Sequence, residues 1–107
     1  MKAPPLLLAL LLAACAGTPP TRAPAPSAAS PVPTATGLAI PGTGREIGFG
    51  RTYASAGESL ARLYGPPEMR TCEGGAILVS EGIELHFTGF GFSGWRTAAG
   101  SAGRLCG

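Results

Sequence analysis

A proline-rich stretch near the N-terminus limits how much of the chain can fold. Residues 16–37 consist mainly of Pro, Ala, Ser and Thr, with Arg22 as the single charged residue. This composition favours extended, polyproline-like conformations and lacks the apolar periodicity of a helix or strand. We therefore expect residues 15–37 to form a disordered linker, followed by one small domain at residues 38–107.

The first 14 residues have the order of a secretory signal. Lys2 supplies a positive charge, residues 6–12 form a short apolar core, and small residues lead directly to Cys15. The stretch is too short to span a bilayer as a mature helix. The run Leu12-Ala13-Ala14-Cys15 resembles the lipobox of bacterial lipoproteins. The resemblance implies that residues 1–14 are removed and that Cys15 carries a diacylglyceryl group and an amide-linked acyl chain such as palmitate.

Lipidation of this kind implies a location in the bacterial cell envelope. Two or three acyl chains hold a protein stably on a membrane, whereas one holds it only reversibly. For a Gram-negative host, Ala16 after the cysteine lacks the aspartate that would resemble an inner-membrane retention signal. The resemblance therefore implies the outer membrane, with the domain facing the periplasm. The alternative is an ordinary cleaved signal in which Cys15 lies near the cut.

Cys72 and Cys106 are the two cysteines of the predicted domain. A domain of about 70 residues is marginally stable on its hydrophobic core alone. An even pair of cysteines in an oxidising compartment favours a disulfide, which would contribute roughly 3–4 kcal/mol in the chain-entropy model. A reactive thiol is the alternative, but the sequence has neither CxxC spacing nor an activating group nearby. We predict a structural disulfide.

One helix is predicted at Ala56–Tyr64. Ser55 and Glu58 have the S-x-x-E spacing of a capping box, and an apolar face repeats at helical spacing after them. Glu58 and Arg62 are placed to pair at i, i+4. Gly65 and the prolines after it end the helix.

Three strands are predicted after the helix, at residues 76–79, 83–87 and 90–92. Of two earlier segments, residues 38–40 suggest a short extended piece followed by a turn, and residues 46–50 suggest a second short strand, weakened by its glycines. The apolar face of a three-stranded antiparallel meander needs a cover, and the helix can supply it. The predicted fold class is therefore α+β, a small two-layer domain with one short helix packed on a three-stranded antiparallel meander.

Phe49–Thr52, the helix end at Leu63–Pro67 and Gly94-Trp95 occur in an order that resembles the SmpA/OmlA (BamE-like) lipoprotein family. Members of that family carry a glycine-threonine start, a helix that closes on Leu-Gly-x-Pro, and a β-meander. The same layout is similar to the β-lactamase-inhibitor-protein fold. The resemblance implies a helix-on-meander domain in an envelope lipoprotein.

The sequence offers little for catalysis. Residues 89–94 match GxGxxG, but no helix or downstream acid is predicted after them, so a bent strand is the better interpretation. His86 is the single histidine, and alternation along its strand predicts that it faces solvent beside Glu84. We therefore expect no catalytic site, no metal site and no cofactor.

Charge adds a further constraint, because the six arginines of residues 38–107 are balanced by six glutamates. No basic stripe is available for phosphates, so nucleic acid is not an expected partner. We expect a membrane-anchored, non-enzymatic interaction module that binds another envelope protein or a cell-wall component. Phe90, Phe92 and Trp95 are the predicted contacts of that partner surface. The alternative is a periplasmic inhibitor or small-ligand-binding module that uses the exposed sheet face.

Overall fold

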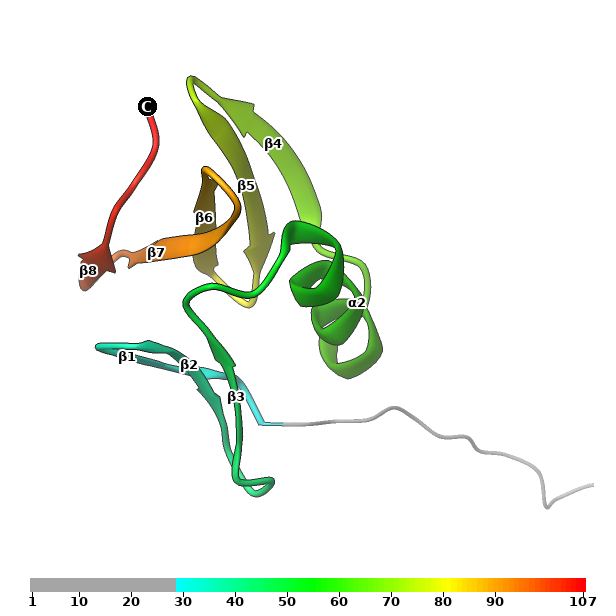
Figure 1. The fold of residues 1–107 in the computed structure, drawn as a ribbon. Coiled ribbons are helices and arrows are strands. Elements are labelled where there is room, and N and C mark those ends of the chain that lie inside the picture. Colours follow the sequence, from blue (N-terminus) through cyan, green and yellow to red (C-terminus); the bar gives the residue numbers. More distant parts are fainter. Residues whose placement is uncertain (1–28) are drawn as a thin grey trace, which may run out of the picture.

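The computed structural model describes residues 29–107, which fold into two antiparallel sheets and one helix (Figure 1). The predicted signal at residues 1–14, the lipidation site Cys15 and most of the predicted linker lie outside the described residues. Within the described part, no helix is long and apolar enough to cross a membrane.

The N-terminal sheet has three strands in the order β1-β2-β3, with bounds Val32–Thr34, Gly37–Ile40 and Arg45–Gly48. Leu38 and Ile47 face each other across β2 and β3, and both are buried. β1 lies within the segment predicted as linker, so regular structure begins before residue 38. Long-range contacts explain why, because the indole Nε1 of Trp95 donates to the carbonyl oxygen of Thr34 at 2.7 Å.

The helix α2 covers Tyr53–Tyr64 and begins three residues before its predicted start. Its N-cap is Thr52, whose Oγ1 accepts the backbone N–H of Ser55 at 3.1 Å. The predicted capping box at Ser55 is therefore wrong, because Thr52 already satisfies the helix start. The predicted end is confirmed, since Gly65 caps α2 with φ 94° and its N–H donates to Ala61.

The C-terminal sheet has five strands in sequence order and forms the larger part of the domain. Its strands are β4 (Glu68–Cys72), β5 (Gly75–Ser80), β6 (Ile83–Thr88), β7 (Gly91–Thr97) and β8 (Gly100–Gly103).

The predicted fold, one helix on a three-stranded meander, is wrong. The three predicted strands correspond to β5, β6 and β7, but β4 and β8 extend that sheet at both edges and β1–β3 form a second sheet. The edge strands lack apolar alternation, because nearly all residues of β4 and β8 are exposed. Their sequences therefore carry no strand signal of the kind that burial produces.

The core lies against the inner face of the five-stranded sheet, which two different elements cover. α2 lies across the β5–β7 part, where the ring of Tyr53 meets Phe87 of β6 edge-on at 5.2 Å between centroids. The chain before α2 covers the β7 part, where Phe49 meets Phe92 at 5.0 Å. A helix of 12 residues is only about 18 Å long and cannot cover five strands alone. The second sheet therefore completes the core.

A bulge in the pairing of β6 with β7 decides which way the aromatic residues of β7 point. The register shifts between His86 and Phe87, so that Gly94 opposes His86 while Phe92 opposes Phe87. The extra residue places both Phe92 and Trp95 on the inner face, although their spacing of three would otherwise put them on opposite faces.

Candidate functional site

Two places in the described part of the chain gather charged side chains. One is the outer face of the five-stranded sheet, which is turned away from α2. Its cross-strand register aligns Glu68, Val79, Glu84 and Arg96 in one row and Arg70, Ile77, His86 and Gly94 in the next.

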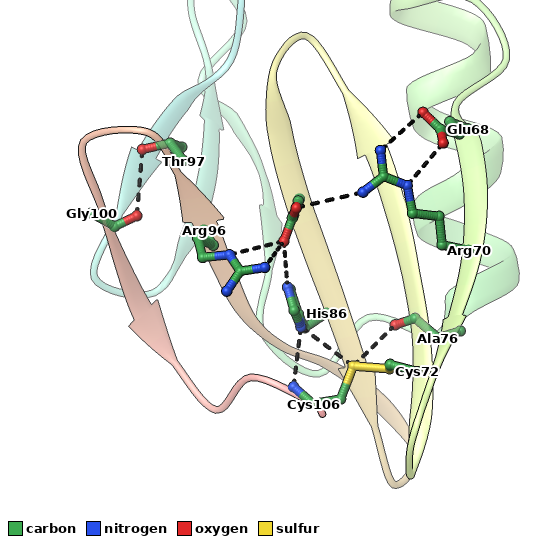
Figure 2. A network of polar contacts seen from close by, with 10 residues as sticks. Glu68, Arg70, Cys72, Ala76, His86, Arg96, Thr97, Gly100 and Cys106 are labelled. Carbon is green, nitrogen blue, oxygen red and sulfur yellow. Dashed lines mark hydrogen bonds and ion pairs between the residues drawn. A yellow bond between two sulfur atoms is a disulfide. The ribbon is translucent and has the colours of Figure 1, made fainter.

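Glu84 is the centre of the polar network on this face, and its partners Arg70, His86 and Arg96 are labelled in Figure 2. Its Oε1 accepts hydrogen bonds from Arg96, with Nη2 at 2.8 Å and Nε at 3.0 Å, and its Oε2 lies 3.6 Å from Nη1 of Arg70. His86 Nε2 lies 3.0 Å from the same Oε1. The hydrogen bond from His86, followed by the bond and charge of Arg96, lowers the pKa of Glu84 below its usual value, against the opposing effect of burial.

His86 is buried, with only 1% of its surface exposed, so the prediction that it faces solvent is wrong. The backbone N–H of Cys106 donates to Nδ1 of its ring at 3.1 Å. The ring proton must then lie on Nε2, which donates to Glu84. His86 therefore links the carboxylate of Glu84 to the backbone of the C-terminal segment.

Residues 104–106, the C-terminal segment, cover His86 by crossing the outer face. The crossing begins where the N–H of Arg104 donates to the carbonyl oxygen of Ser93 at 2.7 Å. Gly94 makes room for it, since a Cβ there would lie 2.6 Å from the carbonyl oxygen of Arg104. The crossing ends at β4, where Cys106 forms a disulfide with Cys72 (Figure 2).

The predicted disulfide between Cys72 and Cys106 is thereby confirmed, with 6.1 Å between the two Cα atoms. It closes the C-terminal segment over His86, whose Nδ1 lies 3.3 Å from Sγ of Cys106. With that sulfur bonded to Cys72 and Glu84 held by three neighbours, the network holds its own parts together and leaves no nucleophile free. The network around Glu84 therefore covers and cross-links the outer face of the sheet.

The residues predicted as a partner surface do not lie together. Phe90 is 98% exposed in the turn between β6 and β7, whereas Phe92 is 2% exposed and belongs to the core. Trp95 is half-buried against the core and its indole N–H is bonded to Thr34. Of the three, only Phe90 is available to a partner as a fully exposed side chain.

The GxGxxG match at residues 89–94 lies in the β6–β7 turn and in β7, and it leads into β8 rather than a helix. Gly91 lies against the chain before α2, where a Cβ would be 2.8 Å from the carbonyl oxygens of Gly50 and Arg51. The close approach of two backbones accounts for the glycine, as the bent-strand interpretation expects.

The second gathering of charge is a cleft of about 430 Å³ between β2, β3 and α2. We name it the arginine cleft, for Arg45, Arg51 and Arg62 in its lining. Its apolar lining comes from Ile40, Ile47 and Leu63. The volume lies within the range of ligand pockets, roughly 300–1,000 Å³.

The arginine cleft is electropositive. Among residues 29–107, Glu46 is the only acid in its lining, and Glu58 beside the cleft pairs with Arg62 at 3.4 Å, so three guanidinium groups and two carboxylates leave one positive charge. The Glu46 carboxylate is held on the N-terminal sheet, where it accepts the Thr36 hydroxyl at 2.8 Å. Within residues 29–107, neither Arg45 nor Arg51 forms an ion pair.

Arg51 is the best-fixed cation of the cleft. Its Nε donates to Oγ of Ser55 at 2.9 Å, and its Nη2 donates to Oγ of Ser59. Both serines belong to α2, so the helix holds the guanidinium in place without neutralising it. Sequence analysis missed this site because its lining comes from β2, β3, the connection before α2 and α2 itself, and only the fold brings them together.

A second depression, of about 570 Å³, lies beside Trp95 and Pro31. It is more open than the arginine cleft, and Glu81 is the one charged residue in its lining. In the described part of the chain, no group of three or more His, Cys, Asp or Glu residues is arranged to hold a metal ion. The arginine cleft is therefore the strongest candidate binding site.

No protein-family model, curated protein or solved structure matches the chain.

Proposed function

We propose that this chain is a lipid-anchored, non-enzymatic binding module of the bacterial cell envelope, and that the arginine cleft is its binding site. The observation that carries the proposal is a cleft of about 430 Å³ with an apolar lining and two guanidinium groups that no carboxylate pairs within residues 29–107. Pockets of this size with a few fixed polar groups are typical of ligand sites.

The location is part of the same proposal. It is supported by the lipobox-like run that ends at Cys15 and by the disulfide, which is typical of proteins in oxidising compartments. The outer membrane, with the domain facing the periplasm, remains the favoured destination. The resemblance to SmpA/OmlA lipoproteins stays a prediction alongside it.

The arginine cleft also supports the alternative of a small-ligand-binding module, but it lies at a different surface from the sheet face that this alternative expected. The outer face of the sheet, which was its expected platform, is crossed by residues 104–106 and occupied by the network around Glu84. The arginine cleft offers a small ligand a more enclosed site than that face.

Site-specific photocrosslinking in intact cells tests the binding site. A benzophenone amino acid at Thr43, in the lining of the cleft, should form an adduct with an envelope component. The matched control is the same substitution at Ser101, an exposed residue of β8. Adducts at Thr43 alone support the proposal, whereas equal labelling at both positions, or none at either, overturns it.

Lipidation is tested separately by fractionation and by labelling with radioactive palmitate. The natural chain should sediment with membranes and incorporate the label, and Cys15→Ser should abolish both. An unlabelled natural chain in the soluble fraction would contradict the anchor while leaving the binding site open to test.

A further inference from the structure

We propose that the ligand of the arginine cleft is an amphiphile with one acyl chain and one anionic head group, either a carboxylate or a phosphate. This inference rests on the proposed function, because it assigns a chemical class to the occupant of the same cleft. Three properties of the cleft lead to it: its apolar lining, its charge and its size.

The lining of the cleft selects for an apolar tail. Ile40 and Ile47 are 4% and 2% exposed and form its base where it meets the core, while Leu63 of α2 adds to the side. An apolar chain in contact with these side chains gains roughly 25 cal/mol for each Å² removed from water. Among residues 29–107, no aromatic side chain lines the cleft, so these residues offer a nucleotide base no surface for stacking.

The charge of the cleft selects for an anionic head. Arg51 offers Nη1, which makes no hydrogen bond or ion pair with the described residues, while its other nitrogens are held by α2. Arg45 is exposed at the rim and unpaired within residues 29–107. Guanidinium groups bind carboxylate and phosphate through pairs of N–H donors, and a pre-positioned one loses little entropy on binding.

The size of the cleft argues for a ligand with one acyl chain. At about 430 Å³ the cleft is near the lower end of the range for ligand pockets. A protein anchored in a membrane would meet amphiphiles with one acyl chain at the membrane surface, where such amphiphiles are concentrated.

The test uses the lipidated protein in phosphatidylcholine nanodiscs and a photoactivatable dodecanoate as the probe. We expect labelling of the segments 40–47 and 59–63, which line the cleft. Excess dodecanoate and dodecyl phosphate should each compete, and their relative potency identifies the preferred head group. Dodecanol and dodecyltrimethylammonium should not compete. Equal competition by all four compounds would overturn the proposal, because it would mean hydrophobic adsorption alone.

Arginine variants test the role of charge. Arg51→Met should weaken labelling by about tenfold, as expected for the loss of one charge-assisted contact. Arg45→Glu should also weaken labelling. It reverses a charge at an exposed position and removes no hydrogen bond to α2, so weaker labelling of this variant cannot be ascribed to misfolding. Arg104→Glu is the matched control, since it changes an exposed arginine outside the cleft. Equal labelling of all three variants would overturn the proposal.

Failure of the ligand class and failure of the function give different results. Adducts of the Thr43 photocrosslinker with an envelope protein, without dodecanoate labelling, would reject the amphiphile and keep the binding module. Absence of both signals would reject both proposals.

Discussion

The two faces of the five-stranded sheet are both covered, but by different means. The inner face is covered by α2 and the N-terminal sheet through apolar packing that includes Leu78, Leu85 and Phe92. The outer face carries ion pairs between its own strands, and a short C-terminal segment crosses it, held by a buried histidine and one disulfide. The comparison teaches that alternation along a strand identifies the core face, while the environment of the other face depends on distant chain segments.

Removal of a large side chain from the inner face should have the largest effect on stability. Phe92→Ala should lower the free energy of unfolding by about 3–5 kcal/mol, because it leaves a cavity where Phe49 and Phe87 now pack. Urea unfolding measures the change. The matched control is Phe90→Ala, which should change it by less than about 0.5 kcal/mol since Phe90 is exposed. Equal effects of the two variants would contradict the assignment of faces.

Removal of the disulfide should have the next largest effect. Cys72→Ser combined with Cys106→Ser should cost about 3–4 kcal/mol, because the two residues are 34 positions apart and the unfolded chain loses its cross-link. The same urea experiment on the oxidised natural protein gives the reference. An unchanged midpoint would mean that the outer face is held by its polar contacts alone.

His86→Leu tests whether the buried ring supports the cover. The variant leaves the N–H of Cys106 without its acceptor and should cost about 1–3 kcal/mol. Hydrogen exchange at the amide of Cys106 should become faster, which a simple loss of packing elsewhere would not produce. Unchanged exchange at that amide would mean that His86 does not hold the C-terminal segment in place.

The carboxylate of Glu84 should make the outer face sensitive to acid. Its pKa is lowered in the folded state, chiefly by the hydrogen bond from His86. The resulting stability is therefore present above the unfolded pKa, about 4.3, and is lost as the pH falls through the lower folded pKa. Unfolding measured between about pH 6 and pH 2 should show this loss, and Glu84→Gln should flatten the curve there.

Glu68→Gln is the control for that curve. Arg70 also lowers the pKa of Glu68, but that carboxylate is more than half exposed, so its contribution is screened by water. If Glu68→Gln flattened the acid limb as much as Glu84→Gln, the central place of Glu84 would be contradicted.

The smallest effect is expected for an ion pair outside both faces. Glu58 and Arg62 of α2 pair at 3.4 Å, with about 70% of each side chain exposed. Glu58→Ala should change the free energy of unfolding by no more than about 0.5 kcal/mol, and salt should reduce even that. A cost as large as that of His86→Leu would mean that exposure does not decide the worth of polar contacts here.

Local signals in the sequence predicted α2, the strands β5 to β7 and the disulfide, because each depends on nearby spacing or on a single pair of cysteines. The second sheet was missed because β1 to β3 are only three or four residues long, too short for a clear alternation. The burial of His86 was missed because residues 104–106 cover it from beyond the next two strands. The inner-face position of Trp95 was missed because a bulge reverses the alternation after Phe92.

The arginine cleft was out of reach for the same reason. Arg62 was predicted only as the partner of Glu58, and nothing in the sequence groups it with Arg45 and Arg51. Their common environment exists only once β2, β3 and α2 are placed together. A site built from distant segments leaves no spacing to recognise.

The backbone crossings at Gly91 and Gly94 have a consequence for the gene. Every missense change in a glycine codon adds a Cβ, and at these two positions that atom would meet backbone atoms within 3.0 Å. Codons for residues at the rim of the cleft can change without unfolding the protein, and such changes can alter which ligand binds. Almost every missense change at codons 91 and 94 should instead destabilise the fold. In a complete mutational scan, these two small residues should tolerate less variation than any charged residue of the cleft.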